Sequence, residues 1–139
     1  MSNVSDREHA SAALVTVQSF YAALARCDVP GVIALLAPDI EWTEAEGFPY
    51  YSGTWRSPQS VLDNLFARIG QDWDGFSAIT LSYVTENDRV VAFGDYGGIH
   101  RTSERPLRAP YAHCFRVRDN RIASFIQHTD TVLVARALP

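Results

Sequence analysis

The spacing of hydrophobic residues changes near residue 73, and this change constrains the fold more than any other feature of the 139-residue chain. Before it, apolar residues recur at helical spacing, as at Leu14, Val17 and Tyr21. After it, apolar and polar residues alternate in segments rich in β-branched and aromatic side chains, a pattern typical of half-buried strands. Helices followed by strands predict an α+β fold, in which a curved antiparallel sheet holds the helices on its concave side.

Three helices are expected in the N-terminal half of the chain. The first covers about residues 6–26. The second follows Asp28, a typical N-cap, and ends at Pro38. The third starts at Ser57, which caps it ahead of a proline in the first helical position, and it ends at Gly70.

Strands are expected between and after these helices. A short strand covers residues 39–44, before the loop that leads into the third helix. A short terminal helix ends the fold, capped by Asp130 or Thr129. The four long antiparallel strands are separated by polar turns and cover residues 73–84, 89–100, 107–117 and 121–128.

The last two strands are expected to form a hairpin with a bulge. Arg116 and Arg118 point outward, so the period of two along a strand turns His113 inward. Asp119-Asn120 suits a bulged turn that contains a left-handed residue, whereas a plain two-residue loop would shift the pairing by one residue. We prefer the bulge because it puts Phe125 inside the fold. The bulged register pairs Phe115 with Phe125 and His113 with Gln127.

The strand over residues 89–100 does not show by its pattern which face is buried. Gly94 and Gly98 lie on one face and leave space above the sheet there. Tyr96 lies between them and can project into that space. We therefore expect the face with Tyr96 to form the wall of a cavity.

Charge and composition exclude several classes of partner. The net charge is −4, from 12 Lys and Arg against 16 Asp and Glu, and no basic run is present, so we expect neither nucleic acid nor a membrane as a partner. The N-terminus has no signal-peptide pattern, and no apolar run approaches the roughly 20 residues that cross a bilayer. We expect one cytoplasmic domain over residues 1–139, with Cys27 and Cys114 as buried free thiols.

Three stretches carry a resemblance to a known superfamily: VQSFYAALARCDVPGVIALLAPDIEW, YYSGTWRSPQSVLDNLF and AHCFRVRDNRIASFIQHTD. With the order of elements, they make the chain similar to the nuclear transport factor 2-like (NTF2-like) superfamily. Within it, the chain most resembles the SnoaL-like polyketide cyclases and the ketosteroid isomerases. The resemblance covers about residues 15–134 and implies a cone of three helices and sheet around a pocket. It says less about activity, because that superfamily includes isomerases, cyclases, epoxide hydrolases, dehydratases and proteins without catalysis.

The resemblance also implies roles for individual positions. In the isomerase pattern the general-base carboxylate falls at Glu44, the carboxylic-acid oxyanion donor at His113, and the tyrosine donor at Phe20. The neighbouring Tyr21 is turned by about 100° around the helix, which makes it a poor substitute. In the cyclase pattern a histidine matches His113, whereas the acid–base aspartate falls on Gln127, an amide that exchanges no proton at neutral pH.

These roles compete with structural interpretations. His113 is either a polar group on the cavity floor or a core histidine satisfied by Gln127 or a backbone carbonyl. Glu44 is either a partly desolvated base or a solvated loop residue, and Glu41 and Glu46 compete with it. The candidate catalytic residues are Glu44, His113, Gln127 and Tyr96. The candidate substrate-binding residues are aromatic and comprise Phe20, Trp42, Tyr50, Trp55, Phe66, Phe115 and Phe125.

No metal or cofactor is expected, because the four histidines show no metal-ligand spacing and no nucleotide-binding motif is present. The leading hypothesis is a cofactor-free isomerase, cyclase or lyase that transfers a proton on a hydrophobic carbonyl compound. The alternatives are a non-catalytic small-molecule binding protein and an association domain that uses its sheet. A homodimer is expected through the outer face of the sheet, which carries Ala112, Cys114, Ile122 and Ile126.

Overall fold

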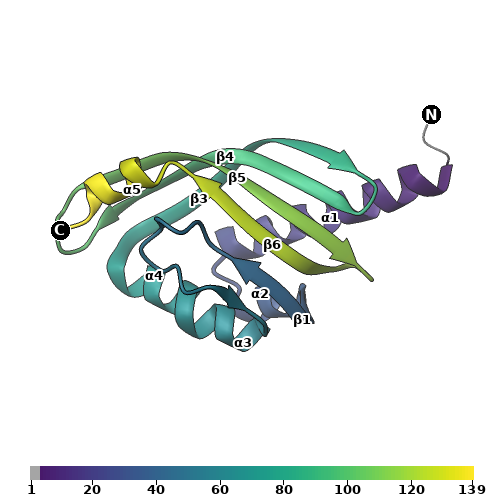
Figure 1. The fold of residues 1–139 in the computed structure, drawn as a ribbon, viewed down its shortest axis with the longest axis horizontal. Helices are drawn as coiled ribbons and strands as arrows, with labels where there is room; N and C mark the ends of the chain where they lie inside the picture. The colour runs from purple at the N-terminus through teal and green to yellow at the C-terminus, as the bar shows by residue number, and fades with distance from the viewer. Residues whose placement is uncertain (1–3) are drawn as a thin grey trace.

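A six-stranded sheet in the order β2-β1-β6-β5-β4-β3 is the frame of the protein in a computed structural model that describes residues 4–139. Figure 1 shows this sheet curving over the helices, with α1 and the α2–α4 segment on the same side of it. The helices are α1 (Val4–Ala25), α2 (Val29–Ala34), α3 (Pro58–Val61), the π-helical turn η1 (Leu62–Phe66), α4 (Ala67–Asp72) and α5 (Thr131–Ala137). The strands are β1 (Leu36–Thr43), β2 (Thr54–Trp55), β3 (Trp73–Glu86), β4 (Arg89–His100), β5 (Pro106–Arg118) and β6 (Arg121–Thr129).

The expected α+β fold with a curved sheet is confirmed. All neighbouring strands pair antiparallel except β1 and β6, which pair in parallel. The long helix α1 buries Ala13, Val17 and Phe20 against the sheet, whereas Leu14 and Tyr21 of the predicted stripe are only half-buried beside them. No helix within residues 4–139 is long and apolar enough to cross a membrane. The cytoplasmic location stays a prediction.

Two predicted helix ends are wrong. Asp28 does cap α2 by accepting from the backbone of Gly31, but the helix ends at Ala34 and Pro38 lies within β1. Proline is tolerated there because the pairing of β1 with β6 is irregular between Leu36 and Glu41, so no regular ladder hydrogen bond is lost. Pro38 therefore interrupts the pairing without ending the strand.

The third helical segment runs on past its predicted end. Ser57 caps it through a capping box with Ser60, as expected of its N-terminus. At the other end, Gly70 lies inside α4, which continues to Asp72. A Cβ at Gly70 would meet nothing within 4 Å, so this position requires no glycine and does not stop the helix.

The predicted pairing of β5 with β6 is confirmed, but the bulge lies within the strands and not at the turn. His113 pairs with Gln127 and Phe115 with Phe125, and the register shifts between Arg116 and Val117. Arg118 pairs with Arg121 across a plain two-residue loop, in which Asp119 and Asn120 both have a positive φ, 51° and 59°, as a type I′ turn requires. The extra residue of the bulge is Ala123, which lies in β6 between the partners of Val117 and Arg116. The predicted faces and their pairing therefore come directly from the alternation in these two strands.

One residue of the predicted outer face is wrongly placed. Ile122 is fully buried, because the shift at the bulge pairs it with inward-facing Val117. Ile126 on β6 and Phe93 on β4 are exposed, and β5 lies between their strands in the sheet. The homodimer through this face stays a prediction.

The predicted cap of the last helix is confirmed, whereas the predicted burial of Cys27 is not. Asp130 caps α5 by accepting a hydrogen bond from the backbone of Leu133, as predicted. Both cysteines are free, but Cys27 is exposed and Cys114 is only half-buried. The burial predicted for Cys27 is wrong because the residue follows the last turn of α1 in the left-handed conformation, outside any element.

Two glycine substitutions test how closely the elements pack. A Cβ at Gly94 would meet the carbonyl oxygen of Ile79 and the hydroxyl group of Tyr111, whereas Gly70 has open space. We expect Gly94→Ala to lower the free energy of unfolding by about 1–3 kcal/mol. The matched control Gly70→Ala should raise it by about 0.5–1 kcal/mol. Urea unfolding measures both, and an unchanged stability of Gly94→Ala would contradict the close approach of β3, β4 and Tyr111.

Candidate active site

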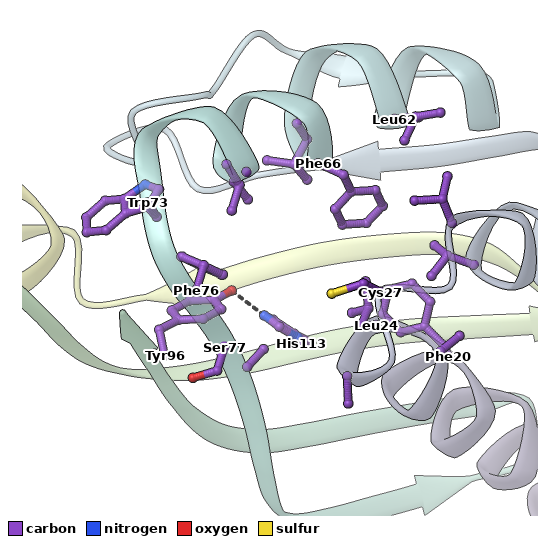
Figure 2. Close-up of a pocket in the computed structure, with 18 of the residues that line it drawn as sticks. Phe20, Leu24, Cys27, Leu62, Phe66, Trp73, Phe76, Ser77, Tyr96 and His113 are labelled. Carbon is purple, nitrogen blue, oxygen red and sulfur yellow. Dashed lines mark hydrogen bonds between the residues drawn. The ribbon is translucent and has the colours of Figure 1, made fainter. Parts of the chain in front are cut away.

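A cavity of about 670 Å³ lies between the concave face of the sheet and the helices. Its volume is in the range of pockets that hold small organic molecules. Figure 2 shows aromatic and aliphatic side chains around it, from α1 on one side, from η1 and α4 on another, and from the sheet. The apolar wall includes Phe20, Leu24, Val32, Leu65, Phe66, Trp73 and Phe76.

Four polar side chains are buried in the wall of this cavity. Glu44 follows β1 directly, and Tyr96, His113 and Gln127 come from β4, β5 and β6. Each has 5% or less of its surface exposed. The structure therefore brings together the four residues that the sequence proposed as catalytic, on the strands whose side-chain alternation points them inward.

Glu44 leaves one carboxylate oxygen without a partner. Its Oε1 accepts a hydrogen bond of 2.8 Å from the indole of Trp42, two residues earlier on the same face of the chain. Its Oε2 is buried and unpaired, and no other buried side-chain nitrogen or oxygen within residues 4–139 is in this state. Burial raises the pKa of Glu44 to about 7, against a smaller lowering by the Trp42 hydrogen bond. A carboxylate with a free oxygen and a pKa near neutrality suits a general base.

The competing carboxylates of this segment lie outside the cavity. Glu41 is exposed and pairs with Arg56 at 2.7 Å, and Glu46 is exposed. Glu44 has only 4% of its surface exposed. The interpretation of Glu44 as a solvated loop residue is therefore wrong.

His113 is a neutral imidazole held between two tyrosines. The hydroxyl of Tyr21 lies 2.6 Å from its Nδ1, and the hydroxyl of Tyr96 hydrogen-bonds to its Nε2 (Figure 2). Burial lowers the pKa of His113 well below its ordinary value, so the ring carries a single proton at neutral pH. Because both nitrogens have protein partners, His113 acts on the cavity through Tyr96.

Gln127 supports Tyr96 and makes no hydrogen bond to the imidazole that it faces in the sheet. Its Oε1 accepts from the backbone N–H of Ala45 at 3.0 Å, and its Nε2 donates to the hydroxyl of Tyr96 at 2.8 Å. The contact with Ala45 fixes which end of the amide points to Tyr96. Gln127 therefore links the residue after Glu44 to the polar group at the centre of the site.

Tyr21 is the polar residue that the sequence analysis missed. It lies outside the cavity wall, as its rotation away from Phe20 predicted, but its hydroxyl still reaches His113. The reason is that α1 lies across β5, so the side of the helix next to Phe20 packs on the sheet and contacts the ring of His113 from behind. The signal was present, because Tyr21 belongs to the stripe at helical spacing that predicted the buried face of this helix.

Four of the seven aromatic residues proposed to bind substrate line the cavity. They are Phe20, Trp42, Phe66 and Phe125. Trp42 stacks on Phe125 with ring centroids 3.7 Å apart, which follows from their pairing across β1 and β6. Trp73, Phe76 and Cys27 also line the cavity, although the sequence analysis did not select them for this role.

The remaining three aromatic residues do not line it. The hydroxyl of Tyr50 donates to Asp72 at 2.7 Å and accepts from the indole of Trp73, so it ties the loop before β2 to the end of α4. Trp55 lies on β2, the edge strand beyond β1. Phe115 packs behind the ring of Phe20 at 5.8 Å. These three residues are buried for packing, which a list of aromatic residues cannot distinguish from a role in binding.

Comparison with known proteins agrees with this architecture. The model of the SnoaL-like domain matches residues 17–125. An NTF2-like protein from Burkholderia thailandensis has 38% sequence identity and a TM-score of 0.87, over 91% of this chain and 98% of that one. No curated protein sequence matches significantly.

Two more distant solved structures share the fold. TerC, crystallised with polyporic acid, has 20% identity and a TM-score of 0.81, over 91% of this chain and 97% of its own. A putative SnoaL-like polyketide cyclase from Jannaschia sp. CCS1 has 12% identity and a TM-score of 0.81, over 93% of this chain and 92% of its own.

Within residues 4–139, no three His, Cys, Asp or Glu side chains are grouped so that they could hold a metal ion.

The buried carboxylate predicts a specific dependence of stability on pH. The pKa of Glu44 is about 7 in the folded protein against an ordinary value of 4.5, so its ionisation costs folding free energy as pH rises between these values. We expect the stability gained by Glu44→Gln, relative to wild type, to grow across this window by on the order of 3 kcal/mol. Denaturant unfolding at pH 4.5 to 8 measures it, with the exposed Glu46→Gln as matched control. A constant difference for Glu44→Gln would contradict the burial of an unpaired carboxylate.

The thiol of Cys27 gives a direct test of the cavity. Cys27 lines the cavity and is also exposed, and Figure 2 shows its sulfur beside Leu24 at the end of α1. In a Cys114→Ser background, we expect a pyrene maleimide at Cys27 to occupy the entrance and to weaken binding of the probe 1-anilinonaphthalene-8-sulfonate by at least about tenfold. Fluorescence titration measures the change. Cys27→Ser protein treated in the same way is the control, and equal affinity in the labelled protein would show that Cys27 does not lie at the entrance.

Proposed function

We propose, because this chain belongs to the SnoaL-like domain family and has the NTF2-like fold, that it is a cofactor-free enzyme of proton transfer on a hydrophobic carbonyl compound. The reaction class is isomerisation, cyclisation or elimination. The observation that carries this proposal is the buried Oε2 of Glu44, which has no hydrogen-bond partner and belongs to a side chain that lines an apolar cavity. Such an atom costs stability unless a ligand uses it.

In the proposed reaction Glu44 takes a proton from the carbon next to the substrate carbonyl. The electrons of the broken C–H bond form an enolate, and the negative charge gathers on the carbonyl oxygen. The proton, held on Oε2, then returns to another carbon in an isomerisation. In a cyclisation the enolate carbon attacks a second carbonyl group, whose electrons move to its oxygen, and that oxygen takes the proton from Glu44. In an elimination the electrons expel a leaving group, which takes the proton instead.

The hydroxyl of Tyr96 is the donor that we propose for the enolate oxygen. It is buried, it lines the same cavity as Glu44, and it is held by Gln127 and His113. A fixed donor in a site without water stabilises a developing oxyanion more than water does. His113 contributes as a neutral partner of Tyr96, which modifies the sequence-based expectation that its own ring holds the oxyanion.

The wall of the cavity favours a flat, largely apolar substrate. Phe20, Phe66, Trp73 and Phe76 present rings around the space, while the polar groups come from the sheet side (Figure 2). Planar rings pack well against such walls. The polyporic acid bound to TerC and the polyketide-cyclase description of the Jannaschia protein are in keeping with an aromatic or polycyclic carbonyl compound.

One observation favours a second function, the binding of such a compound without turnover. Both nitrogens of His113 and both ends of the Gln127 amide are already hydrogen-bonded within the protein. A site whose polar groups are largely satisfied can hold an apolar metabolite without reacting. The two functions differ in whether the wild-type protein changes the ligand that it binds.

The test is a panel of aromatic and polycyclic ketones with acidic α-hydrogens in deuterated buffer, followed by NMR for deuterium exchange and product. We expect exchange by the wild-type protein and its loss by roughly 10²–10⁴-fold in Glu44→Gln, the usual contribution of a general base. Glu41→Gln and Glu46→Gln are matched controls, because both carboxylates are exposed in the same segment.

Each outcome of this test distinguishes the proposals. Exchange that survives in Glu44→Gln eliminates Glu44 as the base. Tight binding by the wild-type protein without exchange or product supports the binding function instead. Retained circular dichroism of Glu44→Gln shows that lost activity is not lost folding.

A further inference from the structure

Arg101 is a positively charged residue in the wall of an otherwise largely apolar cavity. His113 is neutral, so Arg101 is the one cation in that wall within residues 4–139. Four other arginines form ion pairs with carboxylates, whereas Arg101 forms none. Because its side chain is exposed, Arg101 lies where the cavity opens to solvent.

The turn after β4 holds Arg101 at this opening. The backbone N–H of Arg101 donates to the carbonyl oxygen of Asp72, the last residue of α4, at 2.8 Å. His100 is buried, and its Nδ1 accepts from the backbone N–H groups of Thr102 at 3.2 Å and Ser103 at 3.4 Å. A buried polar residue that the proposed reaction does not use therefore fixes the backbone that carries the arginine. A group fixed in this way loses less entropy when it binds a ligand.

The guanidinium group of Arg101 has most of its N–H groups free. Its Nη2 donates to the carbonyl oxygen of Gly70, which also lines the cavity, over a long distance of 3.5 Å. The group makes no other hydrogen bond within residues 4–139. A guanidinium presents five donors in a planar fork that matches the two oxygens of a carboxylate. The free donors of Arg101 can therefore bind such a group on a ligand.

The carboxylates around the cavity do not neutralise Arg101. Asp28 lines the cavity, but it caps α2 and pairs with Arg26 at 3.5 Å. Glu44 forms no ion pair with any residue that the structure describes, and Asp72 forms none with Arg101. A fixed cation without a counterion at the opening of an apolar pocket is a polar group that can orient a ligand.

The place of Arg101 on the chain sets which end of a ligand it meets. Arg101 follows Tyr96 by five residues, which is up to about 16 Å along an extended strand. Figure 2 shows Trp73, which directly follows α4, at the end of the cavity away from Phe20 on α1. The backbone bond to α4 places Arg101 at this same end. A ligand whose carbonyl group lies at Tyr96 would therefore reach Arg101 with its opposite end.

We propose that Arg101 binds an anionic oxygen group, a carboxylate above all, at the end of the substrate distant from the reacting carbonyl. The substrate class is then an aromatic or polycyclic keto acid. This inference rests on the proposed function for the orientation of the substrate in the cavity. The preference of the cavity for an anion is a property of binding and needs no turnover. The two proposals can therefore fail separately.

The experiment compares two fluorescent probes that differ only in a sulfonate group, 1-anilinonaphthalene-8-sulfonate and the neutral N-phenyl-1-naphthylamine. Fluorescence titration gives the Kd of each. In Arg101→Gln we expect the ratio of the sulfonate Kd to the neutral Kd to rise by roughly fivefold at low ionic strength, the effect of a partly exposed ion pair. Salt screens such a pair, so the rise should shrink at high ionic strength.

Arg108→Gln is the matched control, because it removes the same charge from an exposed arginine on β5 that does not line the cavity. Its ratio of the two Kd values should equal that of the wild-type protein. An unchanged ratio in Arg101→Gln, or an equal rise in Arg108→Gln, would overturn the proposal. Circular dichroism of both variants shows whether the fold is retained.

A matched pair of ketones separates this proposal from the proposed function. In the deuterium-exchange test, 6-acetyl-2-naphthoate carries a carboxylate where 6-acetyl-2-naphthamide is neutral. We expect Arg101→Gln to lower the ratio of kcat/KM for the carboxylate to kcat/KM for the amide by a similar factor. Exchange with an unchanged ratio would support the enzyme and refute the anion site. A charge-dependent Kd in a protein without exchange would refute the enzyme and leave the anion site in place.

Discussion

The β-bulge at Ala123, beyond the Asp119-Asn120 turn, sets the register of the inner part of β5 against β6, and the whole site depends on that register. Side chains on a strand alternate with a period of two, so a slip of one residue would turn His113 outward and bring its charged or half-buried neighbours inward. The observed register instead pairs His113 with Gln127 and Phe115 with Phe125. The two-residue turn pairs Arg118 with Arg121, and the extra residue in β6 then shifts the pairing by one, so the bulge determines which groups face the cavity.

This register places several polar groups in a largely apolar interior. Nearly all of these groups are hydrogen-bonded within the protein. Tyr96, His113 and Gln127 use one another, Tyr21 and a backbone amide as partners. Glu44 breaks this rule with one buried oxygen that has no partner. A fold selected for stability alone has no reason to keep such an atom, and exceptions of this kind are typical of functional sites.

A feature could be predicted from the sequence when the interaction that produces it is local along the chain, and could not when it depends on distant residues. The inward direction of Tyr96 and His113 was predictable because alternation along a strand is local and regular. The strand position of Pro38, the helical position of Gly70 and the burial of Ile122 were not, because each depends on a tertiary partner or a bulge.

The same limit applies to the site, where the positions of polar groups could be predicted but their surroundings could not. A buried carboxylate could be proposed at position 44, but its free oxygen depends on a surrounding wall that only the folded chain supplies. The packing roles of Tyr50 and Trp55 were hidden for the same reason, since aromatic residues look alike in sequence whether they line a cavity or fill a core.

The arrangement of Phe20 and Tyr21 shows how a small change on one helix alters the chemistry that a fold can support. Phe20 presents a ring without a hydroxyl to the cavity, while the adjacent Tyr21 puts its hydroxyl behind the imidazole. A hydroxyl on the cavity wall would contact a ligand directly, whereas the hydroxyl of Tyr21 contacts His113. Of the buried polar groups that line the cavity, the two that we propose to act on a ligand are Glu44 after β1 and Tyr96 on β4. Because both come from the sheet side, the helices are left to supply the apolar wall, and the shape of that wall is what selects the ligand.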